Sequence, residues 1–179
     1  MWAERSMMYR LAGLLLLTLA ACSNDPGTGP QAVKWDRDAC ERCRMVISDR
    51  HFAAQVRYFP AGKRSRLAAF DDIGCASLWL DGQPWKDDPR TELWVADYRT
   101  GEWIDARTAT YVENQLTPME YGLGAQAEPV SGGLNFAQAK QRIVEVEKRF
   151  GRHGVQLLDR LKEQAAKRQA ERQIPAGSQ

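Results

Sequence analysis

The chain of 179 residues carries 25 basic and 23 acidic side chains, a net charge of only +2 at neutral pH. This balance gives no argument for nucleic-acid binding, which would call for a strongly basic domain or patch. The length suits one domain or two small ones, and four cysteines with five methionines direct attention to sulfur chemistry.

Residues 1–21 are expected to be a lipoprotein signal peptide. Arg5 and Arg10 precede an apolar run that is too short for a permanent membrane helix, which needs about 20 apolar residues. The run ends in Leu19-Ala20-Ala21-Cys22, which resembles the lipobox of bacterial lipoproteins. The resemblance implies cleavage before Cys22, a lipid on its sulfur and a place on the periplasmic face of a bacterial membrane. An ordinary signal peptide followed by a chance cysteine is the alternative.

A lipidated tether is expected at residues 22–35, because glycine, proline and small polar residues dominate it and predict a flexible linker. Residues 36–99 are then expected to form a first α+β unit. Aromatic and β-branched residues predict a hairpin of two strands, 52–59 and 67–70. Helical spacing of apolar residues predicts a helix after this hairpin, and a further strand follows at 93–97.

Two capping signals frame that first helix. Asp71 or Asp72 is a natural N-cap, which is the structural alternative to any role in acid–base chemistry, and the helix is expected to end near Gly82.

Residues 100–150 are expected to form a second α+β unit. Strands are predicted at 102–105 and 109–112, followed by a helix that Asn135 caps. The apolar face of this helix is Phe136, Ala139, Ile143, Val146 and Phe150.

Gly151 and Gly154 are expected to break that helix, and residues 151–179 to form a helical tail. The tail could pack on the domain, engage a partner or stay solvated. The order of elements predicts an α+β fold of two small ββαβ-type units packed together, with a helical C-terminal extension.

The segment that carries chemistry contains Cys40, Cys43 and Met45, two thiols and a thioether within six residues. Thiolate and thioether are the soft ligands that select Cu(I). If Cys22 is acylated, three thiols remain in an oxidising compartment, and an odd number cannot all form disulfides within the chain. At least one thiol is therefore free or held by a metal.

Several alternatives remain open for this segment. A c-type haem site requires histidine after the second cysteine, where Arg44 stands. Structural zinc needs four ligands, and only Cys75, His51 and His153 are available to complete the set. A thiol–disulfide redox pair usually lies at a helix N-terminus, whereas this motif precedes the first strand. A strained disulfide between the two cysteines is the remaining alternative.

The neighbouring residues are also open to two interpretations. Arg42 and Arg44 either offset the charge of bound thiolates and lower their pKa values, or are ordinary surface charges. Met45 is followed by apolar residues and could fill the core instead of binding metal. Cys75 is expected to pack as a small apolar side chain, and His51 to lie at the surface.

Five motifs lie within roughly residues 36–150: Cys40-x-x-Cys43-x-Met45, Ser48-Asp49, Phe52-Ala53-Ala54-Gln55, Phe70-Asp71-Asp72-Ile73-Gly74-Cys75 and Pro118-Met119. Taken together, they resemble the NosL family of copper-chaperone lipoproteins, which is associated with nitrous oxide reductase assembly. Family members often have glycine where Arg44 stands, and the segment from Gly151 onward has no counterpart.

The resemblance implies two ββαβ units related to organomercurial lyase, and a Cu(I)-binding chaperone rather than an enzyme. The implied ligands are Cys40, Cys43, Met45 and Met119, although Met119 could instead pack between the two units. The implied partners are an ABC-type transporter with a periplasmic partner and nitrous oxide reductase as copper acceptor. A thiol–disulfide oxidoreductase that uses the two cysteines and a lipoprotein with structural zinc remain the alternative functions.

Overall fold

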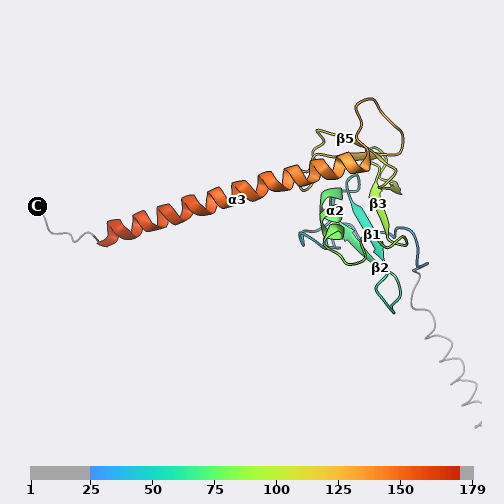
Figure 1. The fold of residues 1–179 in the computed structure, drawn as a ribbon, viewed down its shortest axis with the longest axis horizontal. Coiled ribbons are helices and arrows are strands. Elements are labelled where there is room, and N and C mark those ends of the chain that lie inside the picture. Colours follow the sequence, from blue (N-terminus) through green and yellow to red (C-terminus); the bar gives the residue numbers. More distant parts are fainter. Residues whose placement is uncertain (1–24, 174–179) are drawn as a thin grey trace, which may run out of the picture.

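The computed structural model describes residues 25–173, so the predicted signal peptide and the lipidation site Cys22 lie outside the described residues. Figure 1 shows a body of strands and a short helix, from which one long helix projects. The α+β class predicted from the sequence is confirmed.

The larger sheet is antiparallel and has the strand order β2-β1-β3-β4. Its strands are β1 (Ala54–Tyr58), β2 (Arg66–Phe70), β3 (Glu92–Ala96) and β4 (Trp103–Asp105). In the hairpin, Ala54 lies opposite Phe70 and Tyr58 opposite Arg66. The helix α2 (Ile73–Asp81) follows β2 directly and packs against β1 and β2. The strands, helix and strand from β1 to β3 therefore form one ββαβ unit.

The predicted cap of α2 is confirmed. The Asp72 side chain accepts a hydrogen bond of 2.8 Å from the amide of Gly74, and Gly82 is the C-cap residue. Asp72 rather than Asp71 satisfies the free amides of the first turn. Asp71 is therefore left for another role.

The second region is smaller than the first. It contains a two-stranded sheet of β5 (Thr110–Val112) and β6 (Gly124–Gln126), and the long helix α3 (Phe136–Gln173). The remaining strand of this region, β4, extends the larger sheet instead. The two regions are thus joined by main-chain pairing as well as by side-chain packing.

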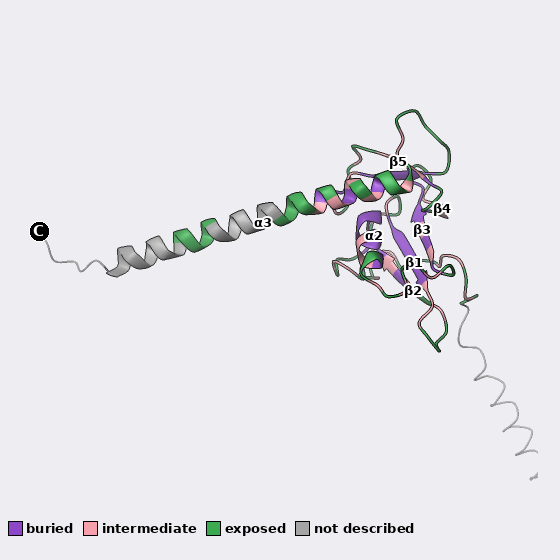
Figure 2. Ribbon diagram, viewed as in Figure 1, coloured by how far each residue is buried: buried purple, intermediate pink, exposed green. Residues whose placement is uncertain are grey.

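The helix α3 begins with a reciprocal capping box. The amide of Gln138 donates to the Asn135 side chain at 3.0 Å, and the Asn135 amide donates back to the Gln138 side chain at 2.9 Å. Ala139, Ile143 and Val146 are buried, as the predicted apolar face requires, but Phe150 at the end of that face is 43% exposed. In Figure 2 the buried residues of α3 lie where the helix crosses the body.

The predicted break at Gly151 and Gly154 is wrong, because α3 runs through both without interruption. Glycine in a helix interior costs about 1 kcal/mol relative to alanine but keeps its amide donor, so it weakens a helix without ending it. At 1.5 Å per residue the helix is about 57 Å long, and it extends away from the body (Figure 1). Within residues 25–173, no helix has both the length and the apolar character to cross a bilayer.

Residues 25–31, here called the N-terminal strap, lie on the larger sheet rather than forming the flexible linker that was predicted. The Gln55 side chain exchanges two hydrogen bonds of 2.8 Å with the backbone of Gln31. Arg57 is completely buried and pairs with Asp25 at 3.0 Å. Because alternate residues of a strand face opposite sides of the sheet, the polar residues of β1 face the strap.

Candidate metal centre

The cysteine motif forms a tight loop with regular backbone bonds. An isolated bridge pairs Ala39 with Val46, and inside it the Cys40 amide donates to the Met45 carbonyl at 2.8 Å. The Arg44 amide donates to the Cys40 carbonyl at 2.9 Å. Arg44 itself has φ of 65°, a left-handed conformation that turns the chain back at the cost of some strain.

One further bond fixes this loop beside the end of β2. The amide of Glu41 donates to the carbonyl of Ala69 at 2.9 Å. Since β2 is an edge strand, its outer backbone groups are free to accept such a bond. Asp71 and Cys75 follow at the junction between β2 and α2, so the loop lies directly against them.

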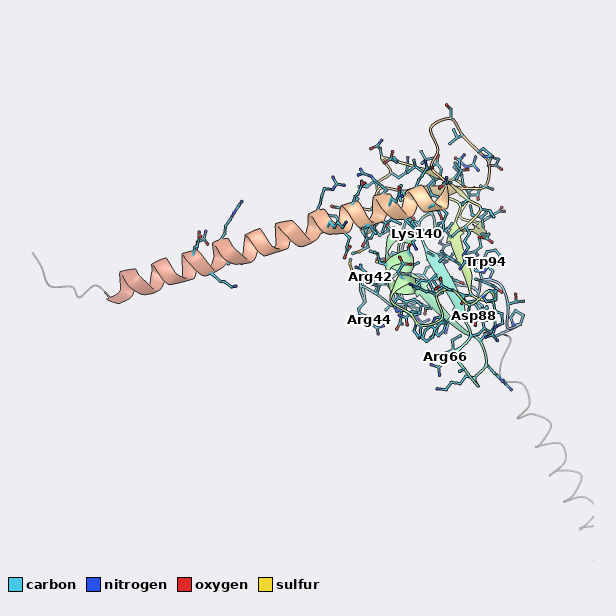
Figure 3. All side chains as sticks on the ribbon, viewed as in Figure 1. Arg42, Arg44, Arg66, Asp88, Trp94 and Lys140 are labelled. Carbon is cyan, nitrogen blue, oxygen red and sulfur yellow. The ribbon has the colours of Figure 1, made fainter. Side chains whose placement is uncertain are left out.

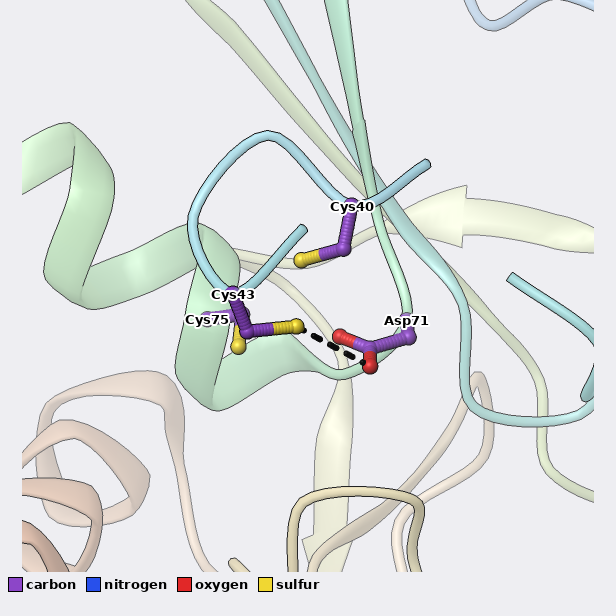
Figure 4. Close-up of side chains that lie close together, drawn as sticks. All are labelled: Cys40, Cys43, Asp71 and Cys75. Carbon is purple, nitrogen blue, oxygen red and sulfur yellow. Dashed lines mark hydrogen bonds between the residues drawn. The ribbon is translucent and has the colours of Figure 1, made fainter. Parts of the chain in front are cut away.

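Four donor atoms converge at this junction, from Cys40, Cys43, Asp71 and Cys75, here called the thiol–carboxylate cluster (Figure 4). All four atoms lie within 4.8 Å of one another. Two sulfurs bound to one ion at about 2.3 Å lie at most about 4.6 Å apart. Only small movements would therefore bring the four groups onto one ion, and the cluster could hold a metal.

One side of the cluster is buried, and the other side is accessible to solvent. Cys40 and Cys75 are completely buried, whereas Cys43 is partly exposed. Asp71 is 2% exposed; its Oδ2 accepts from the Cys43 thiol at 3.4 Å, and its Oδ1 has no hydrogen-bond partner. A buried carboxylate oxygen without a partner is unfavourable. A bound cation would satisfy it.

The three sulfurs differ in acidity because they interact with one another. A hydrogen bond from the Cys75 thiol lowers the pKa of Cys40 to about 6. The same bond, together with burial, raises the pKa of Cys75. Burial raises the pKa of Cys43 to about 11. The interaction with Cys75 therefore favours the thiolate form at Cys40 over the thiolate forms of its two neighbours.

Arg42, which the sequence left open between a site residue and a surface charge, contacts the cluster. Figure 3 shows Arg42 and Arg44 on the same side of the body. Its Nη1 lies 4.0 Å from the Cys75 sulfur, and its Nη2 pairs with Glu147 of α3 at 2.5 Å. Arg44 points outward, with 69% of its side chain exposed, and pairs with Glu41 at 3.3 Å. The two arginines of the motif therefore have different surroundings.

The other predicted site residues lie in different surroundings. Met45 belongs to the loop and is 54% exposed. Met119 is half-buried and packs against the core. His51 lies outside the cluster, at the surface, where its Nδ1 is 3.0 Å from the Tyr98 carbonyl oxygen. The assignment of the two methionines as ligands stays a prediction.

The loop that carries Met119 nevertheless passes close to the cluster. Burial raises the pKa of Asp72 to about 6, while the Thr117 side chain and the Met119 backbone oppose this rise. Both groups therefore lie near the Asp72 carboxyl, one residue from Asp71.

Sequence reasoning misses Asp71 as a member of the cluster, and it offers Cys75 only as a core residue or as one of three side chains that could complete a zinc site. Both residues are buried. The available signal was their spacing, four residues apart across a strand-to-helix junction, in a chain with an odd thiol left over. All three cysteines of the body are free thiols.

The structure thus contains a buried cluster of three thiols and one carboxylate, suited to a metal ion and open on the side of Cys43. Comparison of the chain with models of known protein families, with curated proteins and with solved structures finds no match.

Proposed function

We propose that this chain is a Cu(I) metallochaperone, anchored to the periplasmic face of a membrane by lipid at Cys22, and that it delivers copper for nitrous oxide reductase maturation. The observation that carries the proposal is the convergence of three thiols within 4.8 Å, with one of them reachable from solvent. The resemblance of the cysteine motif to the NosL family supplies the copper acceptor and the ABC-type transporter as partners.

Copper is favoured by the donor set. Thiolates are the ligands that Cu(I) prefers, and three of them can enclose a monovalent ion. Cys40 and Cys75 would hold the ion from the buried side, and Cys43 from the open side. An acceptor thiolate could then bind the ion as Cys43 leaves. This exchange conserves the oxidation state of the metal and requires no acid–base catalysis, which suits a carrier that is not an enzyme.

The same burial pattern argues against a thiol–disulfide oxidoreductase. Such enzymes attack with an accessible cysteine of lowered pKa. Here the accessible residue is Cys43, whereas Cys40 and Cys75 are completely buried. A third thiol beside the pair would also compete for any disulfide that formed.

Structural zinc is a second candidate, favoured by Asp71. Zinc is tetrahedral and can bind carboxylate oxygen as well as thiolate, so three cysteines and one aspartate would complete its coordination. Cu(I) has little use for a carboxylate. The unpartnered Oδ1 of Asp71 is the specific observation in favour of zinc.

The test is metal binding by protein purified without oxygen. We expect one equivalent of Cu(I) to bind in competition with a chromophoric chelator, and Cys43→Ser to weaken binding at least about tenfold. Met45→Leu should also weaken binding if the thioether is a ligand, but it would spare any dithiol redox activity. Unchanged Cu(I) affinity in Cys43→Ser would exclude the copper site, and zinc that co-purifies and supports folding would establish the second candidate.

The anchor and the delivery step are tested separately. Cys22→Ala should move the protein from the membrane fraction to the soluble fraction. Copper-loaded protein should transfer its metal to copper-free nitrous oxide reductase, faster when the ABC-type transporter is present than when it is absent.

A further inference from the structure

A single guanidinium group contacts the thiol–carboxylate cluster and is held there by two other parts of the chain. Nη1 of Arg42 contacts the Cys75 sulfur and also donates to the Tyr121 hydroxyl at 3.1 Å. Nη2 of Arg42 pairs with Glu147 at 2.5 Å. The Tyr121 hydroxyl donates in turn to the second oxygen of Glu147 at 2.7 Å. Among the side chains that the structure describes, no other basic group has a hydrogen bond or ion pair with a member of the cluster.

The groups that hold Arg42 are themselves fixed in position. Tyr121 packs so closely against α2 that a Cβ on Gly74 would lie 2.2 Å from its ring. Glu147 follows Val146, a residue of α3 that is buried against the body. The planar guanidinium group has a rigid fork of donors, so two fixed partners determine where its third contact points. That third contact is the sulfur of Cys75.

The cluster needs such a charge when it is loaded. Three thiolates around a monovalent ion carry a net charge of −2, and around a divalent ion a net charge of −1; the carboxylate of Asp71 adds a further negative charge in either case. Two of the sulfurs are completely buried, and uncompensated charge is strongly unfavourable in such surroundings. Arginine stays positively charged at all physiological pH values.

We propose that Arg42 is a specificity-determining positioning residue, which stabilises the loaded cluster through Cys75 and favours a monovalent over a divalent ion. This inference rests on the proposed metal-binding function. The stabilisation by Arg42 is larger for Cu(I) than for Zn(II), because the cluster is one charge more negative with Cu(I) than with Zn(II). A residue that merely fastened the loop to α3 would affect both ions equally.

The test compares Arg42→Met, Arg42→Lys and a matched control in the full chain. Arg142→Met is the control, because Arg142 also joins α3 to another element, through Glu113 at 3.1 Å, and is 36% exposed against 28% for Arg42. Cu(I) and Zn(II) affinities are measured separately by chelator competition. We expect Arg42→Met to weaken Cu(I) binding about tenfold and Zn(II) binding less. Arg42→Lys should recover part of the loss, and the control should bind both ions like the wild type.

Glu147→Gln keeps the arginine but removes the carboxylate that neutralises it, so its Cu(I) affinity should hold or rise. If Glu147→Gln lost as much Cu(I) affinity as Arg42→Met, Arg42 would only join the loop to α3. The same conclusion would follow if Arg42→Met lost equal affinity for Cu(I) and Zn(II). If Arg42→Met keeps its Cu(I) affinity, the role of Arg42 is overturned, but the proposed metal site is not, because the wild type still binds Cu(I). A wild-type protein that binds neither ion overturns the metal site and this role together.

Discussion

Asp71 is the residue that the two candidate metals would use differently. It is buried, its Oδ1 has no hydrogen-bond partner, and its Oδ2 accepts a hydrogen bond from the thiol of Cys43. Zinc would coordinate this carboxylate, whereas Cu(I) would be satisfied by the three sulfurs.

We therefore expect Asp71→Asn to weaken Zn(II) binding about tenfold or more while changing Cu(I) binding little. Chelator competition with each ion separately measures both effects. Ser77→Ala is a suitable control, because Ser77 is also buried at α2 but lies outside the cluster. An equal loss of Cu(I) affinity in Asp71→Asn would mean that the carboxylate also serves the copper site.

Two glycines provide a matched pair for the packing beside the cluster. A Cβ at Gly74 would overlap the ring of Tyr121 at 2.2 Å, whereas a Cβ at Gly151 would meet nothing within 4 Å. Gly74→Ala should lower the free energy of unfolding by about 1–3 kcal/mol, through overpacking. Gly151→Ala should raise it by up to about 1 kcal/mol, because alanine favours the helix. Chemical denaturation measures both, and a neutral Gly74→Ala would show that Tyr121 is free to move.

At the residue scale, the sequence predicts the local part of the cluster. Cys40 and Cys43 are three residues apart, so their proximity is visible in the sequence. Asp71 and Cys75 reach the same point only because the backbone bond from Glu41 to Ala69 places the loop beside β2. Such a long-range contact leaves no periodic signal in the sequence, so the sequence alone favours capping for Asp71 and packing for Cys75.

At the scale of elements, strands and caps followed the local rules closely. β1 and β2 lie where aromatic and β-branched residues predicted them, and Asp72 and Asn135 cap their helices as expected. The N-terminal strap did not follow from the sequence. Gln55 and Arg57 alternate with apolar residues in β1, a pattern that usually marks a solvated face, but the strap covers that face.

The attachment of the strap leads to a prediction for Arg57. Its side chain donates to the Gly29 carbonyl at 2.9 Å and to Ser65 at 3.0 Å, and pairs with Asp25. Arg57→Met removes all of these bonds, so amides of the strap should exchange with solvent at least about tenfold faster. Amides in the centre of β3 should change much less, as hydrogen exchange read by mass spectrometry can show. Equal acceleration in both places would mean that the whole fold, not the strap, depends on Arg57.

The same contact gives the strap a defined pH dependence. The hydrogen bond from Arg57 lowers the pKa of Asp25 below its ordinary value of 3.8. Because the pKa of Asp25 is lower in the folded state, its pairing with Arg57 stabilises the strap fully above pH 3.8. This stabilisation is lost as the pH falls through the lower folded-state pKa. Protection of the strap amides, corrected for the intrinsic effect of pH, should therefore be constant above about pH 5 and decline below about pH 4. Asp25→Asn should abolish this decline, and a decline that persists would have another origin.

At the scale of the whole molecule, the first residue of the strap, Asp25, and the cluster lie at opposite ends of β2. Asp25 reaches Arg57, which also contacts Ser65 just before β2 begins, whereas Asp71 follows its last residue. Five residues of strand separate these points by about 16 Å. A lipid at Cys22, three residues before Asp25, would therefore hold the hairpin end of the sheet near the membrane. The cluster would then lie at the end of β2 away from the membrane.

The long helix divides the molecule into a part that builds the site and a part that extends from it. The described side-chain contacts between α3 and the body come from its first turns, through Phe136, Lys140, Arg142 and Glu147. The buried residues Ile143 and Val146 lie in the same stretch. Folding and metal binding should therefore depend on α3 up to about Phe150, and less on the rest of the helix.

Two truncations test this division. A chain that ends after Phe150 should keep its Cu(I) affinity and lose no more than about 1 kcal/mol of unfolding free energy. A chain that ends after Gln141 lacks Ile143 and Val146, so it should lose about 3 kcal/mol or more through the missing core side chains. Its Cu(I) affinity should also fall, because α2, which carries Cys75, loses packing against α3. Thermal unfolding and chelator competition measure the two effects. If the longer truncation product also failed to bind Cu(I), the projecting part of α3 would have to belong to the metal site rather than extend from it.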